Sequence, residues 1–413
     1  MTLNATIRAA AAALSLIVPP VGIAQSSVNA APEASESAPE RDAANVVAPF
    51  SILGTEVLPG TRRQLRWTAN HHFAGVAAPT PVLVAHGNEP GPALCLTAAI
   101  HGDELNGIEI VRRVLYTVDP AQLRGTVIGV PIVNLAGFQN NSRYLPDRRD
   151  LNRAFPGDPR GSLAARTAHS LFNQVIRHCD RLVDLHTGSF HRSNLVQLRG
   201  DLNSPEILAM SRAFGAIAVL QSSGIRGSLR HAASKRGIPS VTLEVGEPMR
   251  LQSEEVDTGV RGIRTLMDHM GMQSSDWSWT RKQPVYYRSH WLRADQGGIL
   301  FSVVKLGDRV KPGDLLATVT DPVTDERSEI RSRANGRVLG MALNQVVMPG
   351  FAAFHIGVES SEKEVADEPP GEAETPLSED VDTTEDPPEP APEAAAAESE
   401  AEPEDLPDHT EMD

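Results

Sequence analysis

Cysteine, aromatic residues and long apolar runs are all scarce in this 413-residue sequence. The two cysteines, Cys95 and Cys179, are too few for a scaffold built on disulfides, and buried free thiols are the expectation. A bridge between them would require an exported protein. Aromatic residues make up 4% of the chain, which argues against a surface that stacks on nucleic acid bases. No apolar stretch reaches the ~20 residues of a membrane-spanning helix, so no membrane anchor is expected.

The N-terminus has the pattern of a signal peptide. Arg8 supplies a short positive region, and residues 9–18 form an apolar stretch that is too short to cross a bilayer. Small residues suitable for cleavage follow, with cleavage after Ala24 or Ala30. We therefore predict that residues 1–30 are a signal peptide and that the protein is exported, to the periplasm.

Charge is distributed unevenly along the chain. Residues 359–413 contain 22 acidic residues and one lysine, a net charge of −21, whereas the whole chain carries −15. The remaining residues are thus mildly basic, at +6, which suits an anionic small substrate. The acidic segment is rich in Pro, Glu, Asp and Ala and is predicted to be a disordered tail. Residues 31–46, rich in Ala, Ser, Pro and Glu, are predicted to be a flexible leader.

Short apolar runs alternate with helical patterns between residues 47 and 280, which are predicted to form the catalytic domain. Strands are expected at 81–85, 93–100, 126–133, 182–185, 217–220 and 241–243, and helices at 104–118, 162–176, 204–214 and 259–270. This alternation predicts an α/β fold whose sheet is covered by helices on both faces.

Residues 281–358 differ in pattern, with short β runs, frequent glycines and no helical period. They are predicted to form a small all-β domain. It resembles a biotinyl- or lipoyl-type barrel-sandwich, on residues 307–319 and 334–338. The intervening hairpin, residues 321–327, has no lysine, so no attached prosthetic group is expected. We expect this domain to pack near the mouth of a substrate-binding crevice in the preceding domain and to restrict substrate size, with Tyr286 and Tyr287 reaching toward that crevice.

Two polar motifs stand where apolar strands are expected to end. His101 and Glu104 lie in the sequence HGDE, in which Gly102 allows a bend, and such strand ends open onto the ligand crevice of α/β folds. His186 ends another expected strand, and Asp184 lies on the same side of that strand, where it could orient His186. Imidazole and carboxylate are zinc ligands, and three protein ligands plus water make a catalytic zinc site.

These motifs resemble those of the aspartoacylase and succinylglutamate desuccinylase family, which is related to the zinc carboxypeptidases. The order and approximate spacing of the motifs agree across about residues 80–250, and the small β domain also resembles that family's C-terminal domain. The matching pieces are HGDE at 101–104, Ser142-Arg143-Tyr144, DLNRAFPG at 150–157, DLHTG at 184–188 and LEVG at 243–246. The resemblance implies a zinc carboxypeptidase-like fold with a mixed central sheet, helices on both faces and a C-terminal barrel-sandwich domain.

The same resemblance implies one Zn²⁺ ion bound by His101, Glu104 and His186. Glu244 ends an apolar run that would raise its pKa, and it is predicted to be the general base. Arg143 would stabilise the negative charge that develops on the oxygen of the scissile carbonyl. The segment from 143 to 152 departs from the family pattern because it is slightly longer than in aspartoacylases. Asn152 and Arg153 would hold a substrate carboxylate. Arg192 is expected to be a solvated surface charge.

The leading hypothesis is hydrolysis of the linear amide of an N-acyl amino acid. The alternative is a periplasmic carboxypeptidase-like enzyme that trims peptidoglycan or other short peptides with the same metal and base. A third interpretation, a non-catalytic binding protein on a decayed enzyme scaffold, conflicts with the complete set of ligands and base. The expected partner is the small-molecule substrate, and the sequence is compatible with an oligomer.

Overall fold

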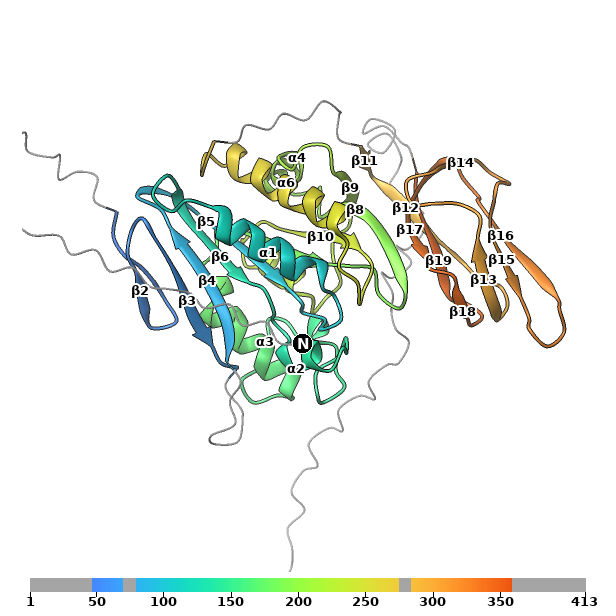
Figure 1. Ribbon diagram of the computed structural model, residues 1–413, viewed down its shortest axis with the longest axis horizontal. Coiled ribbons are helices and arrows are strands. Elements are labelled where there is room, and N and C mark those ends of the chain that lie inside the picture. The colour runs from blue at the N-terminus through green and yellow to red at the C-terminus, as the bar shows by residue number, and fades with distance from the viewer. Residues whose placement is uncertain (1–46, 70–78, 275–283, 359–413) are drawn as a thin grey trace, which may run out of the picture. The chain divides into compact units, whose positions relative to one another are not determined.

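The computed structural model describes residues 47–69, 79–274 and 284–358 (Figure 1). The predicted signal peptide, leader and acidic tail lie outside the described residues. Within the described ranges, no helix combines the length and the apolar character that crossing a membrane would need.

A large mixed sheet forms the centre of the fold (Figure 1). Its strands lie in the order β12-β19-β17-β8-β10-β7-β5-β6-β4-β3, and β9 pairs with β8. Neighbouring strands β10, β7, β5 and β6 are parallel. The antiparallel pairs are β8 with β10, β4 with β6, and β3 with β4. The strands that this sheet contains before residue 247 are β3 (Thr61–Trp67), β4 (Thr80–His86), β5 (Glu89–Ala98), β6 (Arg124–Val130), β7 (Arg181–His186), β8 (Arg192–Gly200), β9 (Ala218–Gln221) and β10 (Ser240–Gly246).

Helices cover both faces of this sheet, as the sequence predicts. Side chains alternate along a strand, so Leu94 and Leu96 of β5 pack with Ile110 of α1, whereas Cys95 packs on the opposite face with Leu171 of α3. Helices α1 and α6 lie side by side on the first face (Figure 1). That face carries α1 (Asn106–Thr117), α4 (Pro205–Arg212) and α6 (Ser253–His269), and the other carries α3 (Leu163–Gln174) and α5 (Leu229–Lys235).

Short elements complete the region before residue 274. They are the paired strands β1 (Phe50–Ile52) and β2 (Thr55–Val57), the helix α2 (Leu135–Gln139), and the 3-10 turns at Leu151–Arg153 and Ile176–His178.

The regular secondary structure of residues 284–358 consists of strands, as the sequence predicts for this segment. Strands β12, β19 and β17 extend the central sheet because β17 pairs with β8, while β16, β15, β13 and β18 form a separate four-stranded sheet. The bounds are β11 (Val285–Tyr286), β12 (Arg288–Arg293), β13 (Gly298–Ser302), β14 (Arg309–Val310), β15 (Leu315–Thr320), β16 (Arg327–Arg331), β17 (Gly336–Ala342), β18 (Gln345–Val347) and β19 (Ala352–Val358).

Strand β8 is the main element that the sequence pattern did not predict. It carries buried polar side chains at Ser193, Asn194 and Gln197 beside the buried Leu198, so apolar and polar residues do not alternate along it. Both of its edges are paired, with β10 on one side and with β17 and β9 on the other. Without an alternation of apolar and polar residues, the strand lacks the periodicity on which sequence interpretation depends.

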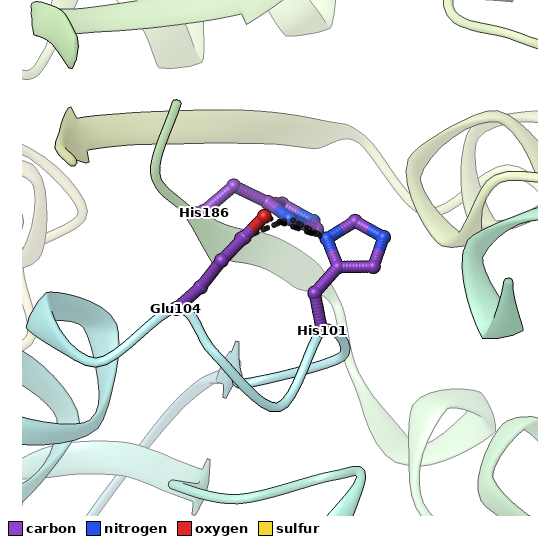
Figure 2. Close-up of side chains that lie close together, drawn as sticks. All are labelled: His101, Glu104 and His186. Carbon is purple, nitrogen blue, oxygen red and sulfur yellow. Dashed lines mark hydrogen bonds and ion pairs between the residues drawn. The ribbon is translucent and has the colours of Figure 1, made fainter. Parts of the chain in front are cut away.

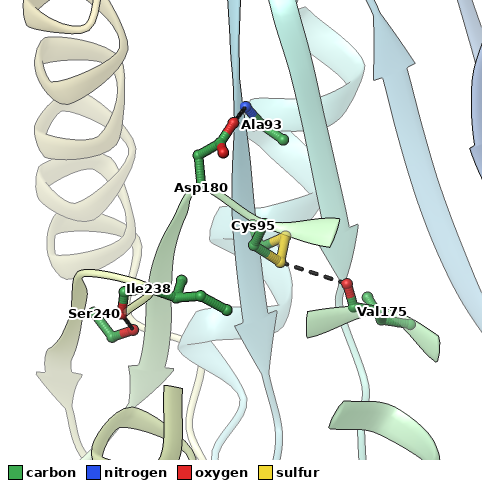
Figure 3. Close-up of a disulfide and its surroundings, with 7 residues drawn as sticks. Ala93, Cys95, Val175, Asp180, Ile238 and Ser240 are labelled. Atoms are coloured by element: carbon green, nitrogen blue, oxygen red, sulfur yellow. Dashed lines mark hydrogen bonds between the residues drawn. A yellow bond between two sulfur atoms is a disulfide. The ribbon is translucent and has the colours of Figure 1, made fainter. Parts of the chain in front are cut away.

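Cys95 and Cys179 form a disulfide, which corrects the expectation of free thiols (Figure 3). Their Cα atoms are 5.7 Å apart, although 84 residues separate them in sequence. Cys95 lies in β5, and Cys179 follows the 3-10 turn that precedes β7. Beside the bridge, the Asp180 carboxylate accepts a 2.7 Å hydrogen bond from the Ala93 amide, which ties the same two segments together.

Candidate active site

The carboxyl ends of three parallel strands meet at one edge of the sheet. His186 is the last residue of β7, and Glu244 lies directly opposite it on β10. On the other side of β7, strand β5 ends at Ala98 and the chain turns through Ala99 and Ile100 to His101. This edge is where open α/β sheets bind their ligands, so the topology brings the predicted site residues together.

The turn after β5 is tightly constrained. Ala99 is buried and adopts a left-handed conformation, with φ of 49°, which non-glycine residues rarely adopt. A Cβ atom on Gly102 would lie 2.1 Å from the backbone carbonyl carbon of Gly137 in α2. Gly102 is therefore required by the close approach of another backbone segment, and its φ is not in the positive range that a glycine-specific bend would have.

His101, Glu104 and His186 converge as a cluster of potential metal ligands (Figure 2). The Glu104 carboxylate lies 2.8 Å from His101 Nδ1 and 2.9 Å from His186 Nδ1. The two Nδ1 atoms are 3.2 Å apart, and one donor atom from each residue lies within 4.8 Å of the others. All three side chains are buried.

Carboxylates hold the opposite nitrogen of each imidazole. Asp184 Oδ2 is 2.9 Å from His186 Nε2, as its position on the strand suggested. Asp150 Oδ1 is 3.1 Å from His101 Nε2, a contact that the sequence interpretation missed although Asp150 opens the DLNR motif. Each carboxylate favours the tautomer in which Nε2 carries the proton and the Nδ1 lone pair faces the cluster.

That tautomer makes the cluster suitable for a cation. Two Nδ1 lone pairs and the Glu104 carboxylate are all acceptors, and they face one another without a donor between them unless a cation or extra protons are present. Burial alone would lower the pKa of His186, but Asp184 and Glu104 raise it well above its ordinary value. Burial would raise the pKa of Glu104, but His101 and His186 hold it well below its ordinary value. The donor set, two imidazole nitrogens and a carboxylate, is one that zinc accepts.

Arg143 lies beside this cluster and is nearly buried. Its Nη1 donates to Glu104 Oε1 at 3.3 Å and to Ser189 Oγ at 2.8 Å, and its Nη2 donates to Asp150 Oδ2 at 2.9 Å. The guanidinium also lies over the Phe190 ring, 5.4 Å from the ring centroid. These contacts fix a cation within reach of a group bound at the ligand cluster.

Glu244 lies on the adjacent strand with its carboxylate oriented by two residues of β8. Asn194 Nδ2 donates to Oε2 at 3.0 Å, and Arg199 Nε is 3.6 Å from Oε1. Burial raises the pKa of Glu244, and the cations Arg199 and His186 oppose that shift only in part. Glu244 is thus buried, but its neighbours here are polar, and sequence reasoning missed Asn194 and Arg199 because it did not identify β8.

A pocket of about 580 Å³, including the part open to solvent, joins these groups. Asn152 and Arg153, the predicted substrate-binding residues, are among its lining residues. Asn152 Oδ1 accepts a hydrogen bond from the Leu229 amide at 2.9 Å. The Arg153 side chain is 36% exposed and lies at the rim of the pocket. Pocket-lining residues also include Thr187, Ser189, Arg199, Ile225, Ser228, Arg230 and Thr242, which the sequence analysis had not assigned to the site.

Two predictions about the surroundings of the site were wrong. Arg192 is buried, and its guanidinium lies over the rings of Trp291 and Phe351 instead of in solvent. Tyr286 packs into a small apolar cluster with neighbouring strands, and Tyr287 packs against the main core. No described residue after 284 lines the pocket.

Comparison with known proteins agrees with this architecture. The model of the succinylglutamate desuccinylase/aspartoacylase catalytic domain matches residues 90–270. A relative from Halomonas elongata, N-alpha-acetyl-L-2,4-diaminobutyric acid deacetylase, is 27% identical over 280 residues, which cover 64% of this chain and 81% of the relative.

Two solved structures have the same fold. A succinylglutamate desuccinylase/aspartoacylase from Rhodobacter sphaeroides superposes with a TM-score of 0.65 at 26% identity, covering 73% of this chain and 96% of that one. The product-bound ectoine utilization protein EutE (DoeB) from Ruegeria pomeroyi superposes with a TM-score of 0.66 at 24% identity, covering 72% of this chain and 95% of that one.

The fold and the site define a hydrolase with a mixed α/β sheet and a candidate metal centre at the carboxyl edge of its parallel strands. Residues 90–270 of this chain match the succinylglutamate desuccinylase/aspartoacylase catalytic domain, in agreement with the resemblance found in the sequence. Members of this family are deacylating hydrolases that act on non-peptide amide bonds, and this chain is an enzyme of that class.

Proposed function

We propose that this protein is a zinc-dependent deacylase that hydrolyses an N-acyl amino acid to a carboxylate and a free amine. The observation that carries the proposal is the convergence of one His-Glu-His cluster, the buried Glu244 and the largely buried Arg143 on a single pocket.

His101, Glu104 and His186 would hold the zinc ion, with Nδ1 of each imidazole and the carboxylate as donors. When bound, zinc supplies Lewis-acid polarisation and lowers the pKa of a water molecule toward ~7. Asp150 and Asp184 hold both imidazoles in the tautomer that leaves Nδ1 free to donate its lone pair.

Glu244 would take the proton of the attacking water and later deliver a proton to the leaving nitrogen. Its buried position supports this role because a carboxylate in an apolar setting holds a proton more readily than one in water. The hydrogen bond from Asn194 to Oε2 holds the carboxylate in one orientation, so little conformational entropy is lost when it contacts the reacting water.

Arg143 would donate to the carbonyl oxygen of the scissile amide as negative charge develops there. A guanidinium that is already fixed by Asp150 and Ser189 needs little reorganisation during the reaction, which is the basis of electrostatic stabilisation of an oxyanion.

The amino acid carboxylate would bind Asn152 and Arg153 at the rim. Arg199 and Arg230 add positive charge to the pocket wall, while the acidic residues among the lining are Glu104 and Glu244, which have other roles. A cationic wall favours an anionic substrate. The planar fork of an arginine suits a carboxylate, which supports an N-acyl amino acid as the substrate class.

A substrate panel tests this proposal. We expect zinc-loaded protein to release free amine from N-acetyl or N-succinyl derivatives of amino acids, and to act at least ~10-fold less well on the matching amino acid amides, which lack the carboxylate. Short peptides from cell-wall cross-links form the comparison set. Turnover of peptides alone would overturn the deacylase proposal in favour of the carboxypeptidase-like alternative.

We further propose that the protein is exported to the periplasm. The signal-like pattern of residues 1–30 and the Cys95–Cys179 disulfide support export independently, because disulfides persist in oxidising compartments. Expression of the full chain should place it in the periplasm without free thiols, whereas a variant lacking residues 1–30 should stay in the cytoplasm. Cytoplasmic retention of the full chain would contradict the proposal.

A further inference from the structure

The loop between β7 and β8 adopts an unfavourable backbone conformation close to the site. Phe190 and His191 are consecutive residues with positive φ angles of 54° and 56°. The left-handed region is disfavoured for side chains other than glycine, and two such residues in succession require support from the surrounding structure. Conformations of this kind cluster at functional sites, so the source of the support is informative.

The turn between β17 and β18 supplies the first part of that support. The His191 carbonyl oxygen accepts two hydrogen bonds, from the Leu343 amide at 2.9 Å and from Gln345 Nε2 at 2.8 Å. Both donors belong to the C-terminal strand region, which lines no part of the pocket.

Arg192, the next residue, supplies the second part. Its Nη1 donates to the Ala352 carbonyl at 3.3 Å, and its guanidinium lies 5.2 Å and 5.3 Å from the ring centroids of Trp291 and Phe351. Its Nε donates back to the Ser189 carbonyl at 3.0 Å. The C-terminal strands thus hold the loop at His191 and Arg192, and Arg192 in turn ties it to Ser189.

The other side of the loop contacts Arg143. Ser189 Oγ accepts from Arg143 Nη1 at 2.8 Å, and the Phe190 ring lies against the same guanidinium at 5.4 Å. An arginine side chain has several rotatable bonds, so these two contacts remove conformations in which the guanidinium would face away from the ligand cluster.

We propose that the C-terminal strands position Arg143 through this loop, with Ser189 and Phe190 as positioning residues. The inference rests on the proposed role of Arg143 in stabilising the oxyanion. It assigns to residues 284–358 an effect on the reaction that does not require them to reach the pocket. Displacing a group that acts on the transition state lowers kcat more than it changes KM.

The first experiment replaces Phe190. Phe190→Ala should lower kcat roughly 10- to 100-fold with KM and zinc content unchanged, and Phe190→Tyr, which keeps the ring, should restore kcat. Phe301→Ala is the matched control, because Phe301 is also an exposed phenylalanine and lies on β13, away from the pocket lining. Unchanged kcat in a folded Phe190→Ala protein would overturn the proposal.

The second experiment acts on the C-terminal strands themselves. Gln345→Leu removes one of the two donors to the His191 carbonyl and should lower kcat in the same direction as Phe190→Ala, by a smaller factor. Val346→Ala, on the same strand and exposed, should leave kcat unchanged. Equal effects of both β18 substitutions would contradict the proposed path through His191.

A double-mutant cycle separates this inference from the proposed function. If Phe190 acts through Arg143, Phe190→Ala should have no further effect on kcat in an Arg143→Ala background. A full additional loss in that background would refute the positioning role while leaving the role of Arg143 intact. Full activity of Arg143→Ala alone would instead refute the proposed role of Arg143, and the inference with it.

Discussion

Replacing Glu244 with glutamine is expected to lower kcat by at least ~10²-fold while zinc stays bound. Glutamine has nearly the shape of glutamate and can still accept the hydrogen bond from Asn194, but it cannot take up a proton. Glu244 is not a member of the ligand cluster, so the metal content should not change. Steady-state kinetics on a deacylation substrate, with elemental analysis of the same samples, measure both quantities.

Glu247→Gln provides the matched control for this experiment. Glu247 is also buried and follows Glu244 by three residues, but it forms an ion pair with Arg250 and does not line the pocket. Its replacement should leave kcat close to the wild-type value. If Glu244→Gln retained wild-type turnover, another group would have to accept the proton, and the proposed mechanism would be wrong.

Removing the metal with a chelator is expected to reduce activity more than about 100-fold and to lower the melting temperature. Stability should fall because the two Nδ1 atoms and the Glu104 carboxylate then face one another as acceptors, or must bind extra protons. Adding zinc should restore both activity and melting temperature. Activity assays and thermal unfolding of the treated and the reloaded protein give the two readouts.

Two histidine variants make the metal experiment specific. His101→Ala should bind zinc far more weakly, whereas His269→Ala, at the exposed end of α6, should bind it as the wild type does. Retained turnover in protein that elemental analysis finds free of metal would rule out the proposed zinc chemistry.

Sequence reasoning located the cluster of candidate metal ligands because each of them lies at a recognisable boundary. His101 and His186 follow apolar runs, and Glu104 stands at fixed spacing from His101. Strand ends of parallel neighbours must meet at one edge of the sheet, so two motifs that are 85 residues apart could be expected to converge. The contact of Asp184 with His186 followed from the two-residue period of a strand.

The groups that orient the site were harder to find. Asn194 and Arg199 lie on β8, which mixes buried polar side chains with the buried Leu198, so no apolar alternation marked the strand. Asp150 contacts His101 across 49 residues, and nothing in its local sequence indicates that partner. The disulfide between Cys95 and Cys179 likewise depends on two segments that only the sheet brings within reach.

The sequence by itself determined the class of fold and the candidate metal ligands at its strand ends, because apolar periodicity and ligand spacing are local properties of the chain. Tertiary structure alone decided how Arg143 and Glu244 are held, and through which contacts. Those contacts join β8 and the adjacent loop at Phe190 to Glu244, to Arg143 and to the C-terminal strands, and the contact between Gln345 and His191 spans 154 residues. Strand β17 pairs with β8 across a long stretch of sequence, and the local sequence of neither strand indicates which partner or register it adopts.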